Sequence, residues 1–363
     1  MNPKLRDPLE SWRSILWLAA AAVAAQIVFG GVRPVDGSIL ATLARDGFRA
    51  ELPAFGQYLF DSPLKIVFLK ALGIQSPTLI AGLFLALSFL PFAAAFLAAD
   101  DEWRKSAFLL AAALPLTRIS FGSFGVGDAV MFAGAIAVVV GRSAPVLLVA
   151  SAVLVGWHVQ QGILLLGLVF VLGYVTGERR DRASLAMIVL GVGLGVAFFL
   201  LSRTWMGAPY QSRLDFLLAH LDRFLLRIAF YWPVAIAVAL PGFLLLWLAR
   251  GFRALPWGLF AGTAASFAAA SVTSDVSRVF FILHWPMLLM ILLSKPDTVR
   301  AVRHPAVIVP VLLLSADVPL LTWSGVEVFD WKALAHTFVR YGAPSGWPQL
   351  FLSLAGLSTN VPR

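Results

Sequence analysis

The stretch that decides the fold is residues 126–176, VGDAVMFAGAIAVVVGRSAPVLLVASAVLVGWHVQQGILLLGLVFVLGYVT. It contains three apolar runs, 126–141, 144–157 and 160–176, which are joined by short connections around Arg142 and His158. An apolar α-helix of roughly 20 residues crosses about 30 Å of hydrocarbon. The stretch therefore predicts membrane-spanning helices joined by very short turns, and the same pattern continues on both sides of it.

Hydropathy along the rest of the chain predicts about eleven spans. They fall near 15–30, 78–98, 106–120, 126–141, 144–157, 160–176, 184–201, 229–249, 257–273, 279–294 and 305–321. Of the 363 residues, 60% are hydrophobic and 13% are charged, whereas about 25% charge is typical of soluble domains. We expect one all-α polytopic transmembrane helix bundle over 1–363, with the first span retained as an anchor because no clear cleavage site follows it.

Basic residues alternate between the short connections and indicate the orientation of the bundle. One side holds Lys4, Arg6, Arg13, Arg104, Lys105, Arg142, Arg179, Arg180, Arg182, Arg250, Arg253, Lys295, Arg300 and Arg303. Cytoplasmic loops are enriched in Lys and Arg, so this side is predicted to be cytoplasmic, with a cytoplasmic N-terminus and an extracytoplasmic C-terminus in a bacterial inner membrane. The net charge of +9 is then attributed mostly to basic residues that anchor the cytoplasmic side. No nucleic-acid partner is expected.

Three longer segments, 31–77, 202–228 and 322–363, fall on the outer side. In the first, 38–46 reads as an amphipathic helix that ends at Gly47, and 61–72 reads as a second helix with Asp61 as its N-cap and Pro63 in its first turn. In 211–228, apolar residues recur at helical spacing, which predicts a helix lying in the membrane interface.

Polar residues from several connections are expected on the outer face, and they are the candidate site. Asp36, in a turn beside Gly37, is the first choice for a general base. The candidates for substrate binding are Asp61, Arg118, Asp128, His158, Gln161, Arg203, Arg213, Asp275, Arg278 and His284. Ionisable groups at membrane depth are usually functional, although each of these is alternatively a solvated loop residue.

The most specific motif is TSDVSRVF at 273–280, in which Asp275 and Arg278 share a helix face. Arg278 is expected to hold a phosphate or pyrophosphate while Asp275 orients it; the alternative is an intrahelical ion pair that stabilises the helix end. His284, close to two turns further on, either extends this polar track or packs as a buried side chain.

The remaining candidates also have two readings. Asp128 follows Gly122, Gly125 and Gly127, which permit close approach of a ligand or simply form a tight loop. His158 and Gln161 would hold sugar hydroxyls or the acceptor, or cap a loop. Arg203 and Arg213 suit an anionic lipid substrate, or attract ordinary headgroups.

Several chemistries lack their usual sequence support. The chain has no cysteine, and no P-loop, dinucleotide fingerprint, HExxH or CxxC motif occurs. We therefore expect no bound cofactor, and a divalent metal is doubtful because no clear acidic pair is present. Asp and Glu are nearly absent from the span interiors, which favours a membrane enzyme over a proton-coupled transporter.

The layout resembles the GT-C type of membrane glycosyltransferase. The resemblance is carried by Asp36 directly after the first span, the helix from Ser38 to Asp46, the D-S-P-L start at Asp61, and many later spans with a polar outer face. It implies Asp36 as catalytic base, Arg278 or Arg213 on the lipid phosphate, a polyprenyl-phosphate-linked sugar as donor, and a glycan, lipid or protein as acceptor. Only 322–363 follows the last span, where the family's larger members carry a big soluble domain.

Three alternatives remain open. An O-antigen-type polymerase or ligase would use similar outer arginines on a pyrophosphate carrier. A transporter or flippase for a lipid or polar solute would not depend on Asp36. A non-catalytic assembly subunit is the third.

Overall fold

The structure is a computed structural model, which describes residues 9–30, 37–52, 59–99, 101–122, 127–175, 182–206, 218, 221–250, 257–271, 276–293, 296–316, 320–322 and 325–327. The helices are α1 (Trp12–Gly30), α2 (Gly37–Asp46), α3 (Pro63–Leu72), α4 (Pro77–Leu87), α5 (Leu90–Ala98), α6 (Asp101–Ala113), α7 (Leu116–Gly122), α8 (Asp128–Val140), α9 (Ala144–Trp157), α10 (Val159–Val175), α11 (Arg182–Met206), α13 (Leu221–Arg250), α14 (Trp257–Ser271), α15 (Val276–Leu293), α16 (Pro296–Val302) and α17 (Pro305–Ala316). The expected all-α class is confirmed.

One short ribbon was not expected. β1 (Leu320–Thr322) pairs antiparallel with β2 (Gly325–Glu327), with Leu321 opposite Val326. The apolar run predicted to span to residue 321 ends as a helix at Ala316, and the chain pairs in extended form shortly after it.

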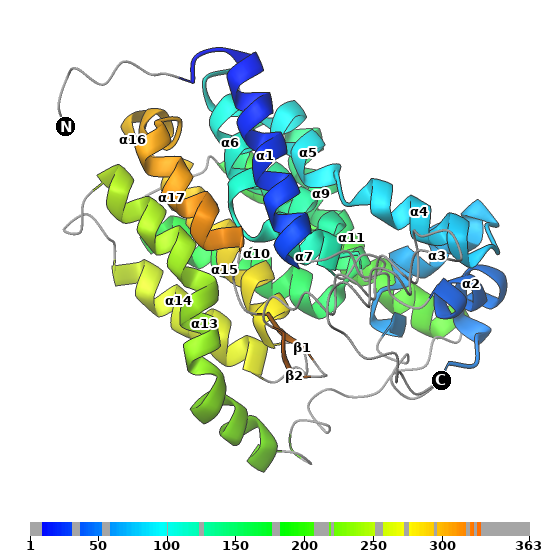
Figure 1. The fold of residues 1–363 in the computed structure, drawn as a ribbon. Coiled ribbons are helices and arrows are strands. Elements are labelled where there is room, and N and C mark those ends of the chain that lie inside the picture. Colours follow the sequence, from blue (N-terminus) through cyan, green and yellow to red (C-terminus); the bar gives the residue numbers. More distant parts are fainter. Residues whose placement is uncertain are drawn as a thin grey trace, which may run out of the picture.

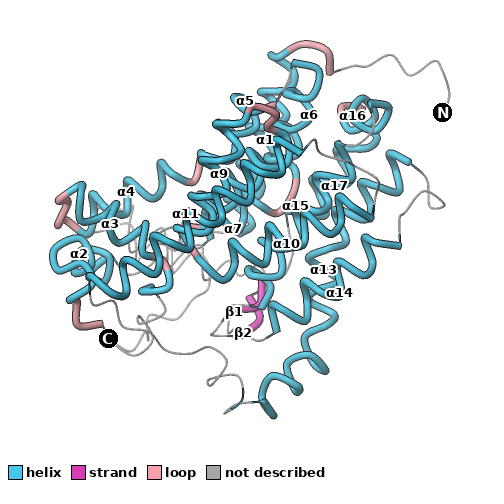
Figure 2. Tube along the Cα trace, turned by 180° about the vertical axis from the view of Figure 1, so that it is seen from behind, coloured by secondary structure: helices cyan, strands magenta, loops and turns pink. Residues whose placement is uncertain are grey.

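The helices form one bundle around α8, α9, α10 and α15, in which α8 and α10 contact each other and both contact α9 and α15. Helices α1, α5, α6 and α7 pack along one side, while α13, α14 and α17 lie on another (Figure 1). Helices α2, α3 and α4 lie together at the end of the molecule away from α13, α14 and α16 (Figure 2). There α3 contacts α9 and α11.

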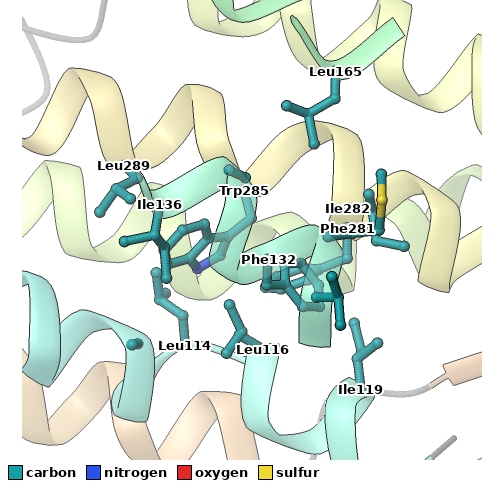
Figure 3. Close-up of a cluster of buried hydrophobic side chains, with 14 of the residues drawn as sticks. Leu114, Leu116, Ile119, Phe132, Ile136, Leu165, Phe281, Ile282, Trp285 and Leu289 are labelled. Atoms are coloured by element: carbon teal, nitrogen blue, oxygen red, sulfur yellow. The ribbon is translucent and has the colours of Figure 1, made fainter. Parts of the chain in front are cut away.

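The core lies where α7, α8 and α15 meet (Figure 3). The ring of Phe132 on α8 packs edge-on against Phe281 and Trp285 of α15, with ring centroids 5.7 and 6.4 Å apart. Leu116 and Ile119 of α7 lie on the same cluster, and all of these side chains are buried. Apolar side chains at these positions exclude water and hold α8 against α15.

Two runs in the described part of the chain are long and apolar enough to cross a membrane. They are Pro77–Ala98, which comprises α4 and α5 with the turn between them, and Arg182–Thr204 within α11. Seven further apolar helices there have 10–17 residues. Each predicted span overlaps at least one described helix, but the number of spans stays a prediction.

Two predicted spans are each interrupted. The run 78–98 is divided into α4 and α5 at Ser88, whose hydroxyl donates to the carbonyls of Phe84 and Ser120 at 3.1 Å. The run 106–120 is divided into α6 and α7 before Leu116, because Pro115 has no N–H and cannot continue the helix.

The outer segments differ in detail from the expectation. Helix α2 coincides with the predicted 38–46 helix and ends at Asp46; Gly47, whose φ of +62° suits glycine, begins a short 3-10 helix to Arg49. Asp61 is not the N-cap of α3: the helix begins at Pro63, so Ser62 takes the cap position.

The described end of the predicted interfacial helix 211–228 does not form a helix of its own. Residues from Leu221 onward belong to α13, which runs to Arg250, and 202–206 belong to α11. No Gly or Pro falls between Leu221 and Ile228, so the helix has no local reason to stop there.

Candidate functional site

An ion pair between Asp128 and Arg278 is the centre of the candidate site. Asp128 is the first residue of α8, and Arg278 lies in the first turn of α15. The Nη1 of Arg278 donates to both carboxylate oxygens, at 3.2 Å each. The Asp128 side chain is 5% exposed and that of Arg278 is 12% exposed, so the pair is largely removed from water at the ends of two core helices.

A third charged group, Lys65 on α3, belongs to the same cluster, and its side chain is 1% exposed. Burial lowers the pKa of Lys65 from 10.5 to about 7; the Asp128 carboxylate opposes this shift and the Arg278 guanidinium adds to it. Both groups therefore lie within electrostatic reach of the amine. We call Lys65, Asp128 and Arg278 the charged cluster.

Tight packing around Trp157 positions α3 and α8 at this cluster. Gly127, the N-cap of α8, has a φ of +92°, and a Cβ on it would lie 2.4 Å from Nε1 of Trp157. The Trp157 ring also packs against Phe68 of α3, with centroids 6.0 Å apart. Phe68 is one turn beyond Lys65 on α3, so Trp157 contacts both the helix that carries Lys65 and the residue before Asp128.

The cluster has two basic groups and one acidic group, contributed by three helices. Arg presents a planar fork of N–H donors and protonated Lys presents three donors, and both bind phosphate oxygens. In a site with little water these interactions are stronger than at a surface. The arrangement is therefore suited to an anionic ligand. Among the described residues, no group of three or more His, Asp or Glu side chains could hold a metal ion.

Three further predicted residues, His158, Asp61 and Gln161, belong to the described part of the chain. His158 directly follows Trp157 as the C-cap of α9 and is partly exposed. Asp61 is buried just before α3. Gln161 is buried on α10. The structure thus brings together Asp128 and Arg278 of the predicted residues, and the common site expected for the whole set stays a prediction.

Arg118 has a different environment from the one predicted. It is 2% exposed, its Nη1 donates to the carbonyl of Ala316 at 2.9 Å, and its backbone N–H donates to Oε1 of Gln26 at 2.9 Å. These contacts join helices. Arg203 is exposed on α11 and lies over the Phe199 ring, 5.9 Å from its centroid.

His284 is enclosed by aromatic rings, which agrees with the packing interpretation. Its ring stacks between Phe243, at 6.0 Å, and Phe280, at 5.2 Å. Its Nδ1 lies 3.3 Å from the Thr263 hydroxyl. These three neighbours come from α13, α14 and α15.

Three predicted residues, Asp36, Arg213 and Asp275, lie outside the described residues. The expected pairing of Asp275 with Arg278 therefore stays a prediction. What the sequence analysis did not find is the pairing of Arg278 with Asp128, 150 residues away.

Two buried polar residues were also missed. Lys65 stands within PLKIVFL of α3, and a lone lysine among apolar neighbours was a signal that could have been used. Gln26 stands in the apolar run of α1 and is fully buried, and a lone amide there was a similar signal.

Comparison with known proteins gives no match: no protein-family model, no curated protein and no solved structure is significantly similar to this chain.

Proposed function

We propose that this chain is an integral membrane glycosyltransferase of the GT-C type, which transfers a sugar from a polyprenyl-phosphate-linked donor on the extracytoplasmic side of a bacterial inner membrane. The observation that supports this most directly is the charged cluster of Lys65, Asp128 and Arg278. The distribution of basic residues in the connections predicts that the bundle end with this cluster faces the outside.

A membrane location is supported by the surface of the bundle. Large apolar side chains are exposed along α11, among them Val189, Leu190, Leu194, Leu200 and Leu201. A contiguous apolar surface of this kind is unfavourable in water and favourable against lipid. Helix α11 also contains one of the two runs long enough to cross a membrane in the described part of the chain.

The charges of the cluster suit the phosphate of the donor. A sugar phosphodiester carries negative charge on oxygens that Arg278 and protonated Lys65 would bind. Asp128 holds the guanidinium in place through both of its carboxylate oxygens. The partial exposure of Arg278 makes it the first group of the cluster to meet a ligand that arrives from the outer side.

The proposed reaction is a displacement at the anomeric carbon. The Asp36 carboxylate takes the proton from an acceptor hydroxyl, and the oxygen then forms a bond to the anomeric carbon. The bond from that carbon to the phosphate oxygen breaks, and polyprenyl phosphate leaves with the negative charge. Arg278 and Lys65 stabilise that charge as it develops.

A transporter or flippase for an anionic lipid or solute is the second candidate, and one observation favours it. Few acidic residues were expected inside the spans, yet Asp128 is buried together with Arg278 and Lys65. Buried ionisable groups within helix bundles also mark transport pathways.

A reconstituted assay separates these functions. Purified protein in liposomes is given polyprenyl-phosphate-linked and polyprenyl-diphosphate-linked labelled sugars, and product and polyprenyl phosphate are measured. We expect turnover of the monophosphate donor, a loss of about 10²- to 10⁴-fold in D36N, and a raised KM for the donor in R278K. Turnover of the diphosphate donor alone would indicate the polymerase or ligase.

Matched controls come from the same outer segment. Glu51 and Arg45 are exposed residues there, and E51Q and R45Q are expected to retain activity. Movement of labelled lipid or solute across the bilayer without sugar transfer, retained in D36N, would overturn the enzyme proposal in favour of the transporter.

A further inference from the structure

A buried hydrogen-bond network joins four helices around Gln26. The Nε2 of Gln26 donates to the carbonyl of Ala112 at 2.8 Å, and its Oε1 accepts from the backbone N–H of Arg118 at 2.9 Å. Nη1 of Arg118 donates in turn to the carbonyl of Ala316 at 2.9 Å. Gln26 is completely buried, and Arg118 nearly so.

Each contact satisfies a backbone group at a helix end. Ala112 lies in the last turn of α6, and Arg118 lies in the first turn of α7. The break at Pro115 leaves such groups without intrahelical partners. The Thr117 hydroxyl donates to the carbonyl of Ala111 at 3.4 Å. Gln26 forms one hydrogen bond on each side of the break, to the carbonyl of Ala112 and from the N–H of Arg118. Arg118 likewise caps the C-terminus of α17, where a cation is favourable.

The helices joined in this way lead into the outer connections. Helix α1 ends at Gly30, shortly before Asp36; α7 ends at Gly122, shortly before Asp128; and α17 ends at Ala316, shortly before β1. The mutual position of these helix ends sets where the three connections begin. The network therefore acts on two residues that the proposed reaction uses, without touching the substrate.

We propose that Gln26 and Arg118 are positioning residues, which hold the outer ends of α1, α7 and α17 in the mutual register from which the connections to Asp36 and Asp128 begin. The kinetic part of this inference rests on the proposed function, whereas its structural part does not. The role of Arg118 is then distinct from the substrate contact predicted from the sequence.

The clearest variant is R118M. It removes the side-chain hydrogen bond to the carbonyl of Ala316 and keeps the backbone hydrogen bond from residue 118 to Oε1 of Gln26. R118K keeps a donor and is the conservative rescue. The natural chain has no cysteine, so spin labels attach only where V28C and L313C are introduced, at exposed positions of α1 and α17. A second labelled pair, V149C on α9 and L194C on α11, is the control away from the network.

Double electron–electron resonance then measures both distances. We expect R118M to shift or broaden the α1–α17 distance distribution, R118K to restore it, and the α9–α11 distribution to stay unchanged. An unchanged α1–α17 distribution in R118M would overturn the proposal. This measurement is decisive even if the protein transfers no sugar.

The kinetic measurement separates positioning from substrate contact. A positioning role predicts that R118M lowers kcat by at least tenfold with little change in the KM for the donor, and that R118K recovers most of it. A raised KM with unchanged kcat would show that Arg118 binds the donor, and would overturn the proposal. If wild type shows no transfer while the distances respond as expected, only the proposed function fails.

Discussion

Nη1 of Arg278 lies 3.2 Å from each carboxylate oxygen of Asp128, although the two residues are 150 positions apart in the chain. One nitrogen serves both oxygens, which differs from the parallel two-nitrogen fork of the strongest arginine–carboxylate pairs. The contact joins the first residue of α8 to the first turn of α15, and so links the two helices whose aromatic rings form the core.

Breaking this pair is expected to destabilise the protein. D128N leaves the Arg278 cation buried without its carboxylate, and the cost of breaking a buried pair is about 3–5 kcal/mol. D128N combined with R278Q should cost less than the sum of the single changes, because the double variant removes both members of the ion pair together. Unfolding in detergent, measured for all four proteins, checks this. Strict additivity would show that the pair contributes no coupling.

The buried amine of Lys65 is expected to make stability depend on pH. Its pKa is about 7 in the folded protein and 10.5 as an ordinary lysine, so between these values the unfolded chain binds more protons. Stability should then rise as the pH increases from about 7 to 10.5 and be insensitive to this group below 7. The measurement is the melting temperature of wild type against K65M across that range. Parallel curves for the two proteins would contradict the prediction.

Replacing Gln26 by leucine is expected to destabilise the bundle by about 1–3 kcal/mol, the cost of leaving buried backbone groups unsatisfied. The carbonyl of Ala112 and the N–H of Arg118 both lose their partner. V28L, at an exposed position on the same helix, is the control and should change stability by less than about 0.5 kcal/mol. Equal melting temperatures for Q26L and V28L would exclude a stabilising role for the amide.

Gly127 should not tolerate a side chain. A Cβ there meets Nε1 of Trp157 at 2.4 Å, and the φ of +92° is itself unfavourable for other residues. Strain and overpacking together predict a loss of about 3 kcal/mol for G127A. Gly73 has a φ of +61° but nothing within 4 Å, so G73A isolates the backbone cost, about 1 kcal/mol. Thermal unfolding of both variants measures the difference, and equal losses would show that Trp157 does not contribute.

The helices were predictable because a helix satisfies its own backbone hydrogen bonds and therefore depends on local sequence. The run 144–157 is α9 to the residue, and 160–176 is α10 within one residue at each end. The breaks were less predictable. Pro115 is visible in the sequence, but whether a proline bends or ends a helix depends on which neighbour satisfies the freed groups, and here that neighbour is Gln26 of α1.

The candidate site was predicted as a set of residues at one end of the bundle, but without its pairings. The sequence favoured Asp275 as the partner of Arg278 because residues three apart share a helix face. The structure shows a contact of Arg278 with Asp128, whereas Asp275 lies outside the described residues. It also shows that Arg118 contacts Ala316 and that His284 is enclosed by Phe243 and Phe280.

The sequence by itself determined where the helices are and which connections carry the basic residues, because both follow from local composition. Only the tertiary structure decided that Lys65, Asp128 and Arg278 form one cluster and that Gln26 joins α1 to α6 and α7. Most positions of α8 are apolar and buried, so the helix carries no polar face that would mark which neighbour it meets. Packing between such helices depends on the fit of side chains from distant parts of the chain, and that fit brings the buried polar groups together.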